Sequence, residues 1–126
     1  MSDTIKRINE LKKEKNAVIF AHYYCPEETQ AAADNIGDSF YLARAAKETD
    51  ADIIVFAGVR FMGESAKILN PGKTVLMPDM KADCPMAHMA SAERIAEVRR
   101  EHPGIAVVCY VNSTAELKCA SDVCVT

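Results

Sequence analysis

Short apolar runs rich in strand-forming residues alternate with stretches of helical period along this chain of 126 residues. The apolar runs predict strands at residues 17–21, 52–57, 74–77, 106–111 and 123–125, and helices are predicted at residues 4–15, 38–47, 61–69, 91–101 and 113–119. Strands that alternate with helices of roughly 10 to 15 residues are typical of parallel α/β proteins. Continuous apolar runs are expected where both faces of a sheet are covered. The pattern therefore predicts three-layer α/β/α units built on short parallel sheets.

The alternation also predicts two domains. The segment before Cys84 holds a complete small unit of three predicted strands, and the segment after it repeats the order helix–strand–helix. We therefore predict a first α/β domain at residues 1–83 and a second at residues 84–126. Since Thr126 falls within a predicted strand, we expect the second domain to be truncated.

The charge and hydropathy of the chain exclude two classes of partner. The formal net charge is -3 and no basic block is present, whereas binding to nucleic acid phosphates needs clustered Lys and Arg. No apolar run approaches the roughly 18 residues that a membrane span requires. The first residues are polar and contain no signal-peptide core, so we expect a cytoplasmic protein.

Five cysteines are many for a chain of this size in a reducing compartment, where structural disulfides are disfavoured. Cys84 lies in a predicted irregular loop beside Pro85, and exposure there suits a metal ligand. Cys119 and Cys124 have C-x4-C spacing, which matches no compact zinc or cluster motif well. Cys109 lies inside an apolar run and is expected in the core. Spacing alone therefore predicts no metal site.

Polar and aromatic residues follow the predicted strands at their carboxyl ends, where open parallel sheets bind ligands. His22 follows the first strand and is suited to hydrogen bonding or proton transfer near neutral pH, but a core histidine capping the strand is an equally good interpretation. Tyr24 and Tyr110 lie at strand ends that we expect to be equivalent. For both tyrosines, packing with the hydroxyl in water is the simpler interpretation.

Two predicted helix starts raise the question of anion binding. Residues 37–39 (Gly-Asp-Ser) and 112–113 (Asn-Ser) offer backbone N–H groups and hydroxyls that suit a phosphate or carboxylate. An ordinary helix cap is the commoner role of such residues. Arg60 could bind an acidic group, although a solvated surface role is simpler. His88 has no supporting neighbours in the sequence and is expected to be structural or exposed.

Five strings in this order resemble the quinolinate synthase family: AHYY at 21–24, ADNIGDS at 33–39, GVRFMGESAKILNPGKTVLMPDM at 58–80, ADCPMA at 82–87 and YVNSTAELKCASDVCVT at 110–126. Agreement over several ordered motifs is far more specific than a lone glycine motif. The resemblance implies three related α/β domains around a pseudo-threefold axis, each giving one cysteine to a central [4Fe–4S] cluster. The chain would then be an incomplete form of the quinolinate synthase fold.

The resemblance also implies an activity. The family is an enzyme of transferase type that condenses iminoaspartate with dihydroxyacetone phosphate. The products are quinolinate, phosphate and water, in de novo NAD biosynthesis. The open iron of the cluster acts there as a Lewis acid. Iminoaspartate would be supplied by L-aspartate oxidase or aspartate dehydrogenase.

In the first domain, the resemblance gives roles to three residues, and a fourth joins them from the loop at the domain boundary. His22 and Ser39 resemble the substrate-binding pair, and Tyr24 resembles a catalytic tyrosine that helps to move protons. Cys84 matches the first cluster cysteine of the family. Cys25 matches no ligand position, and neither do the remaining cysteines (Cys109, Cys119 and Cys124).

In the second domain, the resemblance points to one short segment. Tyr110 and Asn112, with the backbone of Val111, resemble the segment that binds iminoaspartate, and Tyr110 joins His22 and Tyr24 among the expected catalytic residues. The family's other cluster cysteines, further substrate-binding serines and the third domain would lie beyond Thr126. We therefore expect the 126-residue piece alone to be inactive.

Two other functions are consistent with the residues themselves. The first is a flavodoxin-like module that binds a small anion at its strand ends without catalysis. The second is a redox-sensing module that uses Cys119 and Cys124. A cluster that disappears on Cys84→Ser would distinguish the enzyme from both.

Overall fold

A computed structural model of the chain describes residues 2–126. The chain divides into two compact units, of which the first ends at Ala82 and the second spans Asp83–Thr126. The predicted boundary between residues 83 and 84 lies beside this division. Among the helices in the described part of the chain, none combines the length and the apolar character that crossing a membrane would require.

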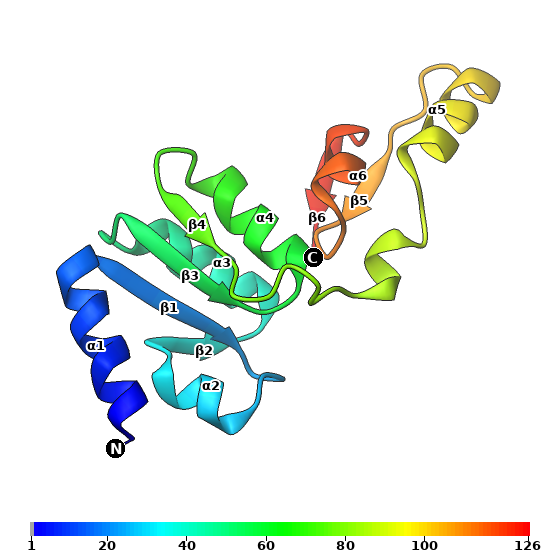
Figure 1. Cartoon of the computed structure of the whole chain (residues 1–126). Coiled ribbons are helices and arrows are strands. Elements are labelled where there is room, and N and C mark those ends of the chain that lie inside the picture. The colour runs from blue at the N-terminus through cyan, green and yellow to red at the C-terminus, as the bar shows by residue number, and fades with distance from the viewer. Residues whose placement is uncertain (1) are drawn as a thin grey trace. The chain divides into compact units, whose positions relative to one another are not determined.

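The first unit is built from alternating helices and strands (Figure 1). Its elements are α1 (Asp3–Lys15), β1 (Ala17–His22), α2 (Glu27–Ala32), β2 (Asn35–Gly37), α3 (Ser39–Glu48), β3 (Ile53–Ala57), α4 (Arg60–Leu69) and β4 (Thr74–Leu76). Over its described residues the unit forms a parallel sheet of four strands in the order β2-β1-β3-β4. The sequence predicted three of these strands and missed β2, together with the short helix α2 that leads to it.

Local capping explains where two of the helices begin. The Ser2 hydroxyl accepts a hydrogen bond from the Ile5 N–H at the start of α1. The Asp38 carboxylate accepts from the Tyr41 N–H at 2.7 Å and caps α3. Short polar side chains at this position satisfy N–H groups that the first turn leaves unpaired. The predicted helix start at residues 38–39 is therefore confirmed, and the cap is Asp38.

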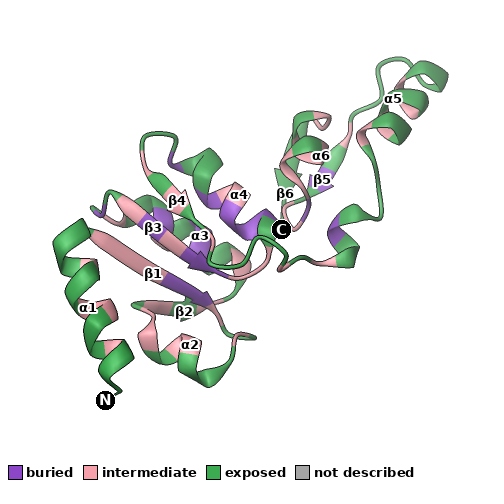
Figure 2. Ribbon diagram, in the orientation of Figure 1, coloured by how far each residue is buried: buried purple, intermediate pink, exposed green. Residues whose placement is uncertain are grey.

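Helices cover both faces of the first sheet, as the apolar runs predicted. The crossover between parallel strands is right-handed, so the order β2-β1-β3-β4 places α2 on one face and α3 and α4 on the other (Figure 1). Phe20 of β1, Ile54 and Phe56 of β3 and Leu42 of α3 are fully buried. Figure 2 shows buried segments in β1, β3 and α4. The rings of Phe20 and Phe56 meet edge to face with centroids 6.2 Å apart. The core of this unit thus lies between the sheet, α3 and α4.

The second unit is smaller and its sheet is less covered. It contains the 3₁₀ helix η1 (Pro85–His88), α5 (Ala92–Glu101), β5 (Val108–Tyr110), α6 (Ala115–Cys119) and β6 (Val123–Val125). Strands β5 and β6 pair in parallel. Val108 and Tyr110 of β5 are exposed on either side of the buried Cys109, and Val123, Cys124 and Val125 of β6 are all exposed. The prediction that both faces of every strand are covered is therefore wrong for this sheet, since one of its apolar faces is open.

Residues 19–37 and 107–125 form a structural repeat with an offset of 88 residues, as Phe20 pairs with Asn35 and Val108 pairs with Val123. The Tyr23 N–H donates to the Gly37 carbonyl at 3.1 Å, and the Val111 N–H donates to the Val125 carbonyl at 2.7 Å. The sequence indicated this repeat only weakly. In the structure, individual hydrogen bonds of the first repeat have counterparts 88 residues later in the second.

An aspartate just before the second strand of each repeat ties that repeat together. The Asp34 carboxylate accepts from the Ile19 N–H at 2.8 Å and pairs with Lys12 of α1 at 2.7 Å. The Asp122 carboxylate accepts from the Val107 N–H at 2.7 Å and pairs with Arg99 of α5 at 2.9 Å. We call these the Asp34 clamp and the Asp122 clamp. Each clamp joins a helix and both strands at the point where the two strands begin to pair.

Candidate functional site

The carboxyl edge of the first sheet contains a topological switch point. The chain leaves β1 toward β2 and leaves β3 toward β4, although β1 and β3 are neighbours. Open α/β sheets bind ligands at such a point. Residues 22–25 follow β1 here and residues 58–60 follow β3. The Cys25 thiol bridges the two strand ends by donating to the Ala57 carbonyl at 3.3 Å.

His22 ends β1 at this edge, beside Gly37 of β2. Its Nδ1 accepts a hydrogen bond from the backbone N–H of Tyr24 at 3.1 Å. Burial lowers the pKa of the imidazole, and the negative charge of Asp38 opposes that effect more weakly. Burial of this kind disfavours the charged form. His22 is therefore a half-buried imidazole whose Nδ1 caps the strand end, so the capping part of the core interpretation is confirmed and the full burial it implied is not.

Two tyrosine rings surround His22. The Tyr23 ring stacks on the imidazole at a centroid distance of 4.4 Å and an interplanar angle of 27°, and the Tyr24 ring lies 4.7 Å away. Tyr24 is 83% exposed. A hydrogen bond with Tyr24 raises the pKa of Tyr23, and the Tyr24 charge adds to that effect. Sequence reasoning overlooked Tyr23, although its place between two predicted site residues was the available signal.

Ser39 lies at the same edge as His22 and Tyr24. It is the first residue of α3 and follows the end of β2 after a single residue, Asp38. Since Asp38 caps the helix, Ser39 does not have the capping role that was the commoner alternative. The structure thus brings His22, Tyr24 and Ser39 to one edge of one sheet.

In the second unit, the predicted segment lies at the end of β5. The side-chain amide of Asn112 donates to the Tyr110 hydroxyl at 3.0 Å, and Tyr110 is 57% exposed. The Val111 N–H bonds to Val125, and its carbonyl accepts from the Ser113 N–H at 2.9 Å. The Ser113 hydroxyl is buried and donates to the Tyr110 carbonyl at 2.7 Å. The anion-binding interpretation of residues 112–113 is therefore wrong for Ser113, because its hydroxyl is used inside the fold.

The structural repeat shows which residues at the strand ends are equivalent, and they differ from those that the sequence predicted. His22 corresponds to Tyr110, and Tyr24 corresponds to Asn112. The expectation that Tyr24 and Tyr110 occupy equivalent positions is wrong, because Tyr24 lies two residues beyond the strand end. Both repeats nevertheless present a ring at the last strand residue and a polar side chain two residues later.

Cys84 is partly exposed and immediately precedes η1. Its N–H donates to Asp83 at 2.8 Å, and its carbonyl accepts from the Ala87 N–H at 3.0 Å. Across residues 2–126, no three Cys, His, Asp or Glu side chains are grouped so that they could hold a metal. Because a [4Fe–4S] cluster is held by several thiolates, the residues present do not by themselves fit one.

Two isolated residues near these segments have partners. His88 Nε2 lies 2.7 Å from an Asp83 oxygen, so the expectation that His88 has no supporting neighbour is wrong, whereas its predicted exposure is confirmed. Arg60 pairs with Glu64 at 3.1 Å on the surface of α4. The simpler surface interpretation therefore describes Arg60.

The remaining cysteines divide by burial. Cys109 is buried, as predicted, while Cys119 and Cys124 are exposed. Cys109 and Cys124 are direct partners on β5 and β6. Partial loss of contact with water, and then the neighbouring Cys109, raise the pKa of the exposed Cys124 thiol. The cysteine in register with Cys124 is therefore Cys109, whereas the redox hypothesis paired Cys124 with Cys119.

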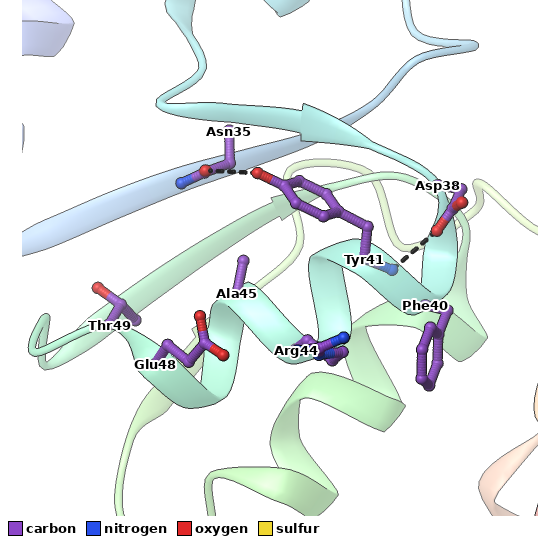
Figure 3. Close-up of a pocket in the computed structure, with 8 residues that line it drawn as sticks. All are labelled: Asn35, Asp38, Phe40, Tyr41, Arg44, Ala45, Glu48 and Thr49. Atoms are coloured by element: carbon purple, nitrogen blue, oxygen red, sulfur yellow. Dashed lines mark hydrogen bonds between the residues drawn. The ribbon is translucent and has the colours of Figure 1, made fainter.

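A pocket of about 550 Å³ lies along α3 and reaches Asp38, which directly follows the end of β2 (Figure 3). Its lining is formed by Asn35, Asp38, Phe40, Tyr41, Arg44, Ala45, Glu48 and Thr49. The Tyr41 hydroxyl donates to the Asn35 side-chain oxygen at 3.3 Å across it. Asp38, from the helix start where an anion site was considered, lines this pocket, whereas His22, Tyr24 and Ser39 do not.

Comparisons with known proteins all indicate the same family. The family described as "Quinolinate synthetase A protein" matches residues 6–126. The chain is 57% identical over its full length to the quinolinate synthase of Prosthecochloris aestuarii (strain DSM 271 / SK 413), of which it covers 38%. It is 55% identical over 98% of its length to a quinolinate synthase of Clostridium perfringens (strain ATCC 13124), of which it covers 41%. It is also 55% identical over 96% of its length to that of Aquifex aeolicus (strain VF5), of which it covers 38%.

The chain therefore spans about two fifths of the length of the curated relatives it matches. The match extends from α1 to the last residue and includes every predicted site residue in both units. On this evidence, the chain belongs to the quinolinate synthetase A family.

Proposed function

We propose that the chain acts as part of a quinolinate synthase that condenses iminoaspartate with dihydroxyacetone phosphate. The products are quinolinate, phosphate and water, in NAD biosynthesis. One observation carries the proposal beyond family membership: His22, Tyr24 and Ser39 lie together at the switch point of a parallel sheet. Ligands bind at this edge of such sheets.

Each of these three residues has a proposed role. His22 and Ser39 bind substrate oxygens through the imidazole and the hydroxyl. Tyr24 moves a proton to or from the reacting atoms, and its exposed phenol is accessible for that purpose. A positioned acid or base of this kind typically contributes a factor of about 10² to 10⁴ in rate.

The second unit contributes the iminoaspartate-binding segment in this proposal. Tyr110 and Asn112 are already held together by the hydrogen bond between their side chains, which limits the ordering needed on binding. The Val111 N–H is engaged by β6, so its carbonyl is the backbone group with a lone pair for the substrate. Tyr110 also acts in catalysis, as its repeat partner His22 does.

Cys84 is the proposed cluster ligand of this chain. A [4Fe–4S] cluster with one open iron supplies Lewis acidity toward a substrate hydroxyl or carboxylate. This chain offers one thiolate at that position, and the others would come from the part of the relatives' length that it does not cover. These residues alone do not support a reaction step on the cluster. We expect the 126-residue chain alone to be inactive.

The flavodoxin-like alternative is not favoured, because the family match covers residues 6–126 and includes both repeats. Iminoaspartate is an unstable imine, so the proposal also implies an enzyme that oxidises aspartate at its amine. L-Aspartate oxidase or aspartate dehydrogenase would have that role.

A chimeric enzyme tests the proposal. The chain replaces the matching segment of the Prosthecochloris aestuarii relative, to which it is 57% identical, and the anaerobically reconstituted protein is assayed for quinolinate. We expect quinolinate formation and bound iron and sulfide, and loss of both with Cys84→Ser. Cys119→Ser is the matched control and should leave both unchanged. A folded chimera that binds iron but makes no quinolinate would contradict the proposal.

A further inference from the structure

The contact between His22 and the backbone of Tyr24 fixes where the imidazole carries its proton. A backbone N–H is always a donor, and it points at Nδ1 of His22 from 3.1 Å. Nδ1 must therefore be the acceptor, with its lone pair toward the N–H. A neutral imidazole whose Nδ1 accepts has its proton on Nε2.

The Tyr23 ring sets the orientation of the imidazole. The two rings are stacked, with a centroid distance of 4.4 Å and an angle of 27°. Tyr24 meets both His22 and Tyr23 at tilted or edge geometry, with centroids 4.7 and 4.6 Å apart. Rotation of the imidazole about its side-chain bonds would break the stack and the Nδ1 hydrogen bond together.

The framework of the first unit holds Tyr23 itself in place. Its N–H donates to the Gly37 carbonyl at 3.1 Å, and its carbonyl accepts from the Gln30 side chain at 3.1 Å. Tyr23 is 48% exposed whereas Tyr24 is 83% exposed. Tyr23 is thus the less exposed of the two tyrosines, and its backbone is hydrogen-bonded to both strand β2 and helix α2.

We infer that Tyr23 is a positioning residue that, with the Tyr24 backbone N–H, holds His22 as a neutral imidazole whose Nε2–H donates to a substrate oxygen. The class of group beside His22 follows from this chemistry: it is an acceptor, such as a carboxylate, carbonyl or phosphate oxygen of one of the two proposed substrates. The inference rests on the proposed function for the identity of that substrate. The lowered pKa of His22 agrees with a neutral ring.

Imidazole NMR of the ¹⁵N-histidine-labelled 126-residue chain tests the inference without requiring activity. The chain has three histidines, and His22→Gln assigns the His22 signals. At neutral pH we expect the pattern of a neutral ring protonated on Nε2. An imidazolium, or a ring protonated on Nδ1, would overturn the inference.

Two variants distinguish the effect of the Tyr23 ring on His22 from that of the hydrogen bond with the Tyr24 N–H. Tyr23→Phe retains the stacking ring and should leave the single-tautomer pattern unchanged. Tyr23→Leu removes the ring, and we expect that pattern to be replaced by averaged signals from both tautomers. If Tyr23→Leu retains the wild-type pattern in a folded chain, Tyr23 has no positioning role. Tyr41→Phe, another tyrosine of the same unit, is the control and should change nothing.

The chimera links the tautomer to binding. His22→Gln places an N–H near the position of Nε2 and should retain part of the affinity for the substrate beside His22, measured as KM for dihydroxyacetone phosphate and for iminoaspartate. His22→Asn places its amide near Nδ1 and should raise KM by at least about tenfold more, an amount equal to ~1.4 kcal/mol. Equal KM values for the two variants would contradict the donor role. A wild-type chimera without activity would refute the proposed function and leave the NMR result standing.

Discussion

Gly37 occupies the point where β2 ends beside His22, and its lack of a side chain has a direct steric reason. A Cβ built on Gly37 would lie 2.2 Å from Cδ1 of the Tyr41 ring. That ring packs over the strand end, and its hydroxyl donates to Asn35. Glycine is therefore required at position 37, because the Tyr41 ring occupies the space that a Cβ would need.

Gly37→Ala should destabilise the chain by about 1–3 kcal/mol, because Tyr41 must leave its place when the strand end is overpacked. Urea unfolding of the 126-residue chain measures the change. Gly72→Ala is the control, since a Cβ there meets no atom within 4 Å, and it should stay within about 0.5 kcal/mol of the wild type. Equal stability of the two variants would show that Tyr41 moves without cost.

The sequence predicted the positions of several candidate site residues where a recognisable strand or helix end carries them. His22 and Tyr110 end strands that could be recognised from their apolar runs, and the helix start at Asp38 could be recognised from its capping residue. Tyr23 could not be assigned a role, because the stack on His22 depends on side-chain directions that the sequence does not contain. The role of Ser113 was mispredicted for the same reason, since its hydroxyl points into the fold.

At the scale of elements, the two aspartate clamps define the repeat better than its strands do. Both carboxylates accept from the N–H that precedes the paired part of the first strand. The aligned repeats share few identical residues, among them Asp34 with Asp122 and Glu28 with Glu116. Periodicity reports apolar faces, so it could not indicate a repeat that is conserved as hydrogen bonds. The strand β2 was missed because Asn35-Ile36-Gly37 contains a single strongly apolar residue.

Asp34→Ala and Asp122→Ala should each release one specific amide. We expect faster hydrogen exchange at the Ile19 N–H in the first variant and at the Val107 N–H in the second, because each amide loses its acceptor. Amide exchange followed by NMR measures both sites in each protein. Every variant is the control for the other, and exchange that increases equally at both amides would contradict a local clamp.

The Asp122 clamp also predicts a pH dependence. The Val107 N–H, and then Arg99, lower the pKa of Asp122 from 3.8. The stability that this carboxylate contributes is therefore present above the unfolded pKa and is lost as the pH falls through the lowered folded pKa. Urea unfolding at a series of acidic pH values should show a loss that Asp122→Asn reduces. An identical pH profile in that variant would exclude Asp122 as the cause.

The register of β5 and β6 predicts which disulfide forms on oxidation. Neighbouring strands lie about 4.8 Å apart, which is within the range of Cα separations that disulfides span. Diamide, which takes two hydrogens from a pair of thiols, should link Cys109 to Cys124, since these residues are in register. Peptide mapping identifies the bond. Cys119→Ser should not affect it, whereas a bond between Cys119 and Cys124 would contradict the register argument.

At the scale of the whole molecule, the equivalent strand ends of the two units carry different side chains. The first repeat ends in His22 and continues to Tyr24, and the second ends in Tyr110 and continues to Asn112. We propose that substrate is handled at the carboxyl ends of these strands.

The most direct test compares kcat/KM for quinolinate formation by the chimera with substitutions at the two ends of its strands. His22→Ala and Tyr110→Ala alter the carboxyl ends of β1 and β5, and Thr74→Ala alters the exposed amino end of β4. We predict a loss of about 100-fold or more for the first two variants and a change of less than about threefold for the third, because an exposed position away from the site contributes little. Full activity of either carboxyl-end variant, or an equal loss with Thr74→Ala, would contradict the account.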